Sequence, residues 1–95
     1  LTRYEGKYGK DSRSTFAALS WDAWMILERA LTAAAAKASP GTKEFRRALR
    51  DGIENTKNLA LNTGVFNYSP RDHAGLVAGD MVWVTIQNNR WKPAQ

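Results

Sequence analysis

Apolar residues recur at helical spacing through much of the first half of the chain. The longest such run extends from about Thr15 to Ala38 and follows capping residues at positions 11–14. At 100° per residue, one face is apolar and carries Phe16, Leu19, Ala23, Ile26, Leu27, Ala30, Leu31 and Ala34. The polar residues that lie roughly opposite are Asp22, Arg29, Thr32 and Lys37. The pattern predicts an amphipathic helix over 15–38 with Asp22 on its polar side.

This predicted helix has a second, smaller apolar surface. Trp21 and Met25 are four residues apart, so they are neighbours, and they lie on the side opposite the broad apolar face. Trp24 lies on a flank. A helix with two apolar surfaces is expected to pack between two layers. Trp21 and Met25 either pack against sequence outside these 95 residues, the interpretation that we favour, or line a ligand cleft.

Two further helices are predicted, one on each side of the long one. A stripe of Leu1, Tyr4 and Tyr8 precedes Gly9, a typical C-terminal stop, and we expect the chain to begin inside this helix. The sequence Ser39-Pro40-Gly41 then breaks the long helix. Thr42 caps a second amphipathic helix over 43–54. Its apolar face contains Phe45, Ala48, Leu49, Gly52 and Ile53.

The pattern changes to short strands in the second half. Residues 55–62 are irregular and predict a loop, and a Pro-containing turn is expected at 69–72. Asn88-Asn89 suits a two-residue hairpin turn because Asn tolerates a positive φ. The predicted strands are 64–68, 80–86 and 90–92. Helices followed by such strands indicate a mixed helix and strand domain.

Composition narrows the class of protein. Ninety-five residues form one small domain at most, and 43% hydrophobic with 24% charged residues is ordinary globular composition. Four Trp residues are many for so short a chain, and their large rings are expected to pack within a domain or against sequence outside these residues. The absence of Cys excludes disulfides, thiolate metal sites and Cys nucleophiles. The sequence shows no basic-then-apolar leader, and no apolar run approaches the 18 or so residues of a membrane span.

The formal charge of +5 and the pI of about 9.9 raise the question of a nucleic-acid partner. The predicted helix over 43–54 carries four basic and three acidic residues, so its net charge is only +1. The other basic residues are scattered along the chain, which is a poor footprint for a duplex. We therefore expect no nucleic-acid partner. The alternative is a free-standing small basic α+β module that binds nucleic acid or an acidic protein partner.

Candidate catalytic chemistry is sparse. His73 is the single His, and it follows Asp72, but neither a nucleophile nor a second His accompanies the pair. One His and one Asp leave two tetrahedral metal positions unfilled. We expect His73 to be a structural residue of the turn, with no catalytic site, no metal and no cofactor. The sequence does not predict an enzyme.

Three ordered blocks and the closing stretch 81–92 carry a family resemblance. They run from Tyr8-Gly9 through Ser20-Trp21-Asp22-Ala23-Trp24, then over 41–51 (GTKEFRRALRD), 64–76 (GVFNYSPRDHAGL) and 81–92. In this order and spacing they resemble the C-terminal region of type I periplasmic solute-binding proteins, the leucine/isoleucine/valine-binding family of ABC importers. The match covers nearly the whole chain. The resemblance implies that residues 1–95 are a C-terminal fragment of an α/β periplasmic-binding-protein-like lobe and not a complete two-lobed fold.

The resemblance also implies a function. Such proteins are periplasmic, or otherwise extracytoplasmic, receptors that capture a small solute and deliver it to an ABC permease; branched-chain amino acids and aromatic acids are the implied solute classes. The candidate ligand contacts are Trp21, Phe66 and Tyr68, although Trp21 stands where the family often has Tyr and keeps only an N–H donor. The fragment alone is not expected to bind solute. Its two-sided long helix suggests self-association.

Overall fold

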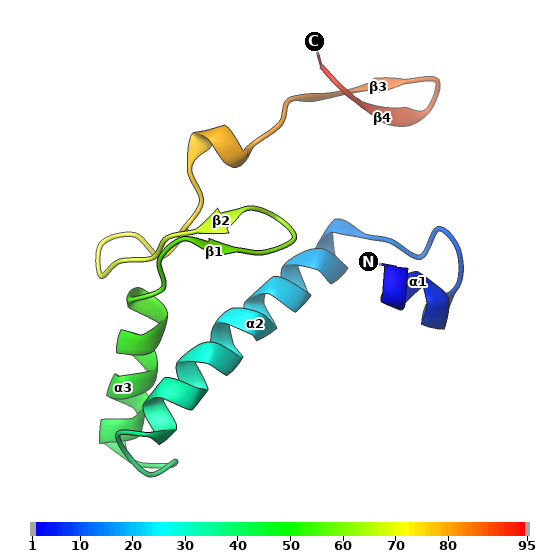
Figure 1. Cartoon of the computed structure of the whole chain (residues 1–95). Coiled ribbons are helices and arrows are strands. Elements are labelled where there is room, and N and C mark those ends of the chain that lie inside the picture. Colours follow the sequence, from blue (N-terminus) through cyan, green and yellow to red (C-terminus); the bar gives the residue numbers. More distant parts are fainter. Residues whose placement is uncertain (1, 95) are drawn as a thin grey trace.

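Helices precede strands along the chain in the computed structural model, which describes residues 2–94. The helices are α1 (Thr2–Tyr8), α2 (Thr15–Ala35) and α3 (Lys43–Glu54), with a 3₁₀ turn, η1, at Ala78–Asp80. The strands are β1 (Leu59–Ala60), β2 (Val65–Phe66), β3 (Val84–Gln87) and β4 (Arg90–Pro93). Figure 1 shows α3 packed beside the C-terminal half of α2 and α1 beside its N-terminal end.

Helix α2 begins where its cap predicts and ends earlier than expected. The Ser14 side chain accepts a hydrogen bond from the Ala17 amide at 3.1 Å. The helix ends at Ala35, three residues before the predicted end, and residues 36–37 form a turn. Pro40 disfavours helical backbone in the residue before it, which limits how far the helix can run.

The buried side of α2 agrees with the predicted face only in part: Ile26, Ala30 and Ala34 are buried as predicted, whereas Ala18 and Asp22 were not on that face. Its buried residues recur every fourth position and are Ala18, Asp22, Ile26, Ala30 and Ala34. Phe16, predicted on the apolar face, is 81% exposed, and the placement of Asp22 on the polar side is wrong. The reason is that α3 and the segment around residue 62 cover this stripe, and the segment supplies polar donors to Asp22.

Helices α2 and α3 approach closely where both residues are small. A Cβ atom added to Gly52 would lie 3.2 Å from both the Cα and the Cβ of Ala30. Any larger residue at this crossing would push the helices apart. The predicted bounds of α3 are confirmed, and its cap is Thr42, whose hydroxyl accepts from the Phe45 amide at 3.1 Å.

Helix α1 is short and is held by a polar contact. It ends before Gly9, whose φ of 98° is the conformation expected of a glycine stop. Leu1, predicted as part of its stripe, lies outside the described residues. Glu5 pairs with Arg13 at 2.7 Å, which joins α1 to the segment that leads into α2.

The β1–β2 pair corrects the predicted loop at 55–62. Leu59 pairs with Phe66 and Ala60 with Val65 in an antiparallel register. The predicted strand 64–68 shortens to Val65–Phe66 because the ladder then gives way to other contacts: the Asn67 amide donates to the Gly75 carbonyl at 2.8 Å. Two-residue strands are too short to show a period in sequence.

The β3–β4 pair is a hairpin with the predicted turn. Asn88 and Asn89 have φ values of 51° and 61°, which confirms the turn, and Ile86 pairs with Trp91. The strand predicted over 80–86 begins only at Val84, because Asp80 caps the 3₁₀ turn by accepting a hydrogen bond from the Val77 amide at 3.0 Å. Strand β4 extends through Pro93, one residue beyond the prediction.

The arrangement is extended. The Cα radius of gyration is 16.9 Å, whereas a compact domain of this length would have about 12 Å. Figure 1 shows why: the β3–β4 hairpin stands apart from the helices at the end of a long connecting segment. The elements mix helices and strands, as predicted. Among residues 2–94, no helix is both long and apolar enough to cross a bilayer.

Candidate functional site

A groove of about 630 Å³ lies between α1 and the N-terminal part of α2. Its lining consists of Thr2, Arg3, Tyr4, Lys7, Tyr8, Ala17, Ala18, Trp21 and Asn62. The lining therefore combines three aromatic rings with two cations, and no carboxylate of residues 2–94 is among it. Such a surface can bind a small molecule that has an apolar body and a negative charge.

The aromatic wall of the groove is built on both helices. Tyr4 and Tyr8 are one helical turn apart on α1, and their ring centroids are 4.6 Å from each other. The Lys7 ammonium lies 5.2 Å from the centroid of the Tyr8 ring, a cation–π distance. Trp21 faces them from α2 and is 53% exposed. Trp21 thus lines the groove together with two tyrosines that the sequence did not suggest as its companions, and its role as a ligand contact stays a prediction.

Asp22 joins α2 to the segment that carries Asn62. One carboxylate oxygen accepts from the backbone amide and the side-chain amide of Asn62 at 3.1 and 2.8 Å. The other accepts from the amide and the hydroxyl of Thr63 at 2.8 and 2.7 Å. Burial raises the pKa of Asp22, but the combined hydrogen bonds from Thr63 and Asn62 outweigh it and hold that pKa below its ordinary value. This clamp fixes Asn62 at the edge of the groove.

Phe66 and Tyr68 lie away from the groove lining. Phe66 is 6% exposed, and its ring is stacked on that of Tyr68 with centroids 5.9 Å apart. Burial, with a smaller contribution from the charge of Asp72, raises the pKa of Tyr68. Gly75 approaches the Tyr68 ring so closely that an added Cβ would lie 2.7 Å from it. The role of these two rings as ligand contacts stays a prediction.

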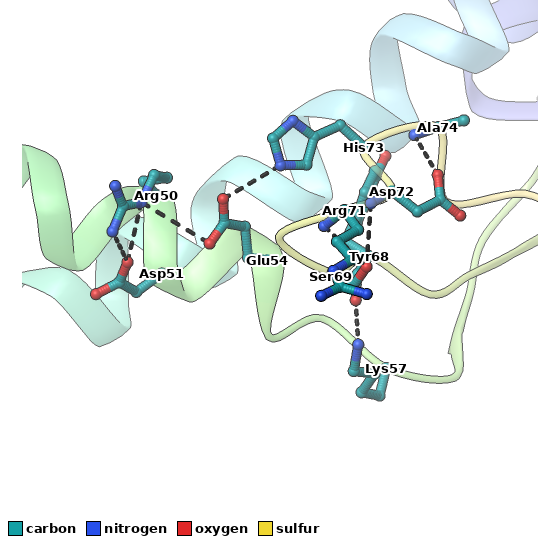
Figure 2. Close-up of polar contacts among 10 residues, drawn as sticks. All are labelled: Arg50, Asp51, Glu54, Lys57, Tyr68, Ser69, Arg71, Asp72, His73 and Ala74. Atoms are coloured by element: carbon teal, nitrogen blue, oxygen red, sulfur yellow. Dashed lines mark hydrogen bonds and ion pairs between the residues drawn. The ribbon is translucent and has the colours of Figure 1, made fainter.

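The turn at 69–72 forms as the sequence predicts. The Ser69 hydroxyl accepts from the Asp72 amide at 3.0 Å, and the Asp72 carboxylate accepts from the Ala74 amide at 2.9 Å. Figure 2 shows these contacts, together with Lys57, whose ammonium donates to the Tyr68 carbonyl. Every polar group named here is used to hold the loop. The turn is therefore a structural element.

His73 extends from this turn to helix α3. Its Nε2 lies 3.2 Å from the Glu54 carboxylate, which is also 3.8 Å from Arg50 (Figure 2). Arg50 pairs with Asp51 at 2.6 Å, and the hydrogen bond to Asp51 raises the pKa of Arg50. These contacts give His73 a structural partner. Over residues 2–94, no group of three or more His, Cys, Asp or Glu side chains is placed to hold a metal ion.

The residue that sequence reasoning missed most clearly is Asp22. The sequence did contain a signal for the burial of Asp22, because this residue lies in register with Ala18, Ile26 and Ala30 at spacings of four. A carboxylate in such a stripe must be satisfied by hydrogen bonds. The donors are at residue 62, the end of the predicted irregular loop, and at residue 63, which was assigned to no element, so nothing in the local pattern identified them.

Comparisons with known proteins place this geometry in context. No protein-family model matches the sequence, and no curated protein matches it either. The chain is similar to solved extracellular ligand-binding receptors from Rhodopseudomonas palustris and from its strain HaA2. The identities are 40% and 38% with TM-scores of 0.83 and 0.84, and a further HaA2 receptor has 34% identity and a TM-score of 0.82.

These matches extend over 99% of this chain but over only 26% of each receptor. The chain thus spans about one quarter of the length of the receptors that it matches. The resemblance to part of a solute-binding receptor is confirmed, as is the α/β class. The matched proteins are ligand-binding receptors and not enzymes, which agrees with a binding role.

Proposed function

We propose that residues 1–95 are a C-terminal segment of a periplasmic solute-binding receptor that delivers a small solute to an ABC permease. The observation that carries this proposal is the similarity of almost the entire chain, at 34–40% identity, to extracellular ligand-binding receptors. The C-terminal position, the periplasm and the permease are parts of the proposal that rest on the sequence resemblance.

The solute is proposed to be a branched-chain amino acid or an aromatic acid. Both carry a carboxylate and an apolar body, which suits the groove beside Trp21, where Arg3 and Lys7 provide positive charge. The α-ammonium of an amino acid has no acidic partner among the described residues of this lining, so the groove suits the aromatic acid better. The three aromatic rings of the lining would favour the aromatic acid, whose flat ring can stack on them. The segment alone is proposed not to bind solute competently, because the matched receptors are about four times longer.

Calorimetric titration of the parent receptor tests the proposal. We expect saturable binding of leucine, isoleucine and valine or of benzoate-type acids, and no saturable binding by the isolated 95-residue chain. Failure of the parent receptor to bind any member of either class would refute the solute assignment. Purification of the parent receptor with a permease, in detergent, tests the delivery step separately.

Trp21 offers a sharper test within the parent receptor. Trp21→Ser removes the ring that faces Tyr4 and Tyr8, and we expect it to weaken binding about tenfold, since a buried aromatic contact contributes more than 1 kcal/mol. Trp24→Ser is the matched control, because Trp24 is similarly exposed on the same helix but does not line the groove. Equal losses of solute affinity in the two variants would show that Trp21 is not a ligand contact.

A further inference from the structure

Helix α3 presents its basic residues to solvent as a single stripe. Its exposed cations recur at spacings of three and four, and they are Lys43, Arg46, Arg47 and Arg50. Residues at these spacings lie on one side of a helix, and this set, here called the basic stripe, extends over roughly 10 Å of the helix axis. Over residues 43–50 the one acidic residue is Glu44, so four positive charges accompany one negative charge.

Most of the basic stripe has no carboxylate partner. The spacing along the helix would allow Arg47 to pair with Asp51, four residues further on. Asp51 instead pairs with Arg50, at 2.6 Å. Over residues 2–94, no carboxylate lies within ion-pair distance of Lys43, Arg46 or Arg47. These three cations are therefore available to a partner outside the chain.

The stability of α3 does not explain the basic stripe. The N-terminal end of a helix carries a partial positive charge, so acidic residues are favourable there and basic residues are not. Lys43 is the first residue of α3 and Arg46 the fourth, whereas Asp51 and Glu54 lie in the last turn. Apart from Glu44 in the first turn, this order is the reverse of the one that the helix dipole favours. An interaction outside the helix is the better explanation.

The surroundings of the basic stripe indicate the kind of partner that it suits. The apolar residues Phe45, Leu49 and Ile53 are partly buried where α3 packs on α2, and no large apolar residue of α3 is exposed. A protein partner normally meets an apolar centre with a polar rim around it, and the stripe has no such centre. A bilayer with anionic lipid needs none, because its surface potential attracts basic residues that lie close to it.

We propose that the basic stripe binds the surface of a membrane that contains anionic lipid. The headgroup phosphates accept hydrogen bonds from the stripe, and the planar fork of an Arg side chain suits this geometry. Binding is peripheral, because α3 exposes no large apolar side chain that could insert. Helix α3 lies beside the C-terminal half of α2, away from α1 (Figure 1), so the stripe is separate from the groove. This interaction goes beyond the proposed function.

Vesicle sedimentation with the 95-residue chain, at low protein concentration and low ionic strength, tests the proposal. The vesicles consist of phosphatidylcholine, either alone or with about 30% phosphatidylglycerol. The stripe variant removes the three cations that have no carboxylate partner, by Lys43→Gln, Arg46→Gln and Arg47→Gln. The control variant removes one Lys and two Arg at exposed positions outside α3, by Arg29→Gln, Arg90→Gln and Lys92→Gln. The two variants have the same net charge.

We expect the chain to bind the anionic vesicles and to bind phosphatidylcholine about tenfold more weakly or less. One basic residue close to an anionic surface strengthens binding roughly fivefold, so the stripe variant should lose about tenfold or more and the control variant less than about threefold. Equal losses of vesicle affinity in the two variants would overturn the proposal, because net charge would then explain them. Equal binding to both kinds of vesicle would also overturn it, because exposed aromatic residues would then be responsible.

An acidic protein surface is the competing occupant, and a polyglutamate peptide is its probe. Binding of this peptide that the stripe variant loses, together with no binding to anionic vesicles, would assign the stripe to such a partner and refute the membrane proposal. Circular dichroism shows whether each variant is folded. If the stripe variant is not, Arg47→Gln alone, compared with Arg29→Gln, should lose roughly fivefold. Neither a solute nor a permease takes part, so the result is separable from the test of the proposed function.

Discussion

The Asp22 carboxylate and Thr63, forty-one residues further along the chain, are joined by two hydrogen bonds of 2.8 and 2.7 Å. Asp22 is 1% exposed, so its negative charge has left water. The other carboxylate oxygen of Asp22 accepts hydrogen bonds from the backbone amide and the side-chain amide of Asn62. This clamp links the long helix α2 to the β1–β2 connection. Replacement of Asp22 should therefore lower the stability of the fold.

Asp22→Asn should destabilise the fold by about 1–3 kcal/mol, because an amide nitrogen would face donors that now meet a carboxylate oxygen. The urea midpoint of unfolding measures the effect. Glu28→Gln is the matched control: it removes one negative charge from the exposed side of the same helix and should change the free energy of unfolding by less than about 0.5 kcal/mol. Equal effects would mean that charge, and not the clamp, is responsible.

The same clamp predicts a dependence of stability on pH. The folded pKa of Asp22 lies below the value of about 3.9 that an unfolded Asp has. The clamp therefore adds its full contribution to the free energy of unfolding above that value. This contribution is lost as the pH falls through the folded pKa. The difference in unfolding free energy between the natural chain and Asp22→Asn should be constant from about pH 5 to 7 and shrink below about pH 4. A difference that stays constant to pH 2 would contradict the assignment.

Gly52 should resist enlargement because of Ala30. Gly52→Val introduces side-chain atoms where a Cβ is already 3.2 Å from the Ala30 backbone, and we expect a loss of about 1–3 kcal/mol from overpacking. Thermal unfolding measures it. Gly6→Val in α1 makes the same chemical change where an added Cβ meets nothing within 4 Å, and it should be nearly neutral. Similar losses at both positions would indicate a helix-propensity effect and not packing.

The isolated chain should self-associate through its uncovered apolar surfaces. On α2, Phe16, Trp21 and Trp24 are all more than half exposed. Sedimentation velocity should therefore show a weight-average mass that rises with concentration above the 10.6 kDa of one chain. Replacing both tryptophans by Ser should reduce the effect. A mass of one chain at high concentration would contradict the prediction.

Local sequence determined the parts of the fold whose energetics are local. The start of α2 at Ser14, the bounds of α3 after Thr42 and the Asn88-Asn89 turn were all predicted correctly. Each depends on a side chain that satisfies backbone groups within a few residues, or on a backbone conformation that Asn tolerates.

Tertiary structure decided the rest, because the partners are far apart along the chain. The burial of Asp22 depends on donors at residues 62 and 63, and the exposure of Phe16 depends on which side of α2 those segments and α3 cover. A hydrophobic period shows that a helix has two sides, but the side that is buried is chosen by whatever packs on it. For α2 that side is covered by α3 and by residues 62 and 63, whose four hydrogen bonds satisfy the Asp22 carboxylate in the buried stripe.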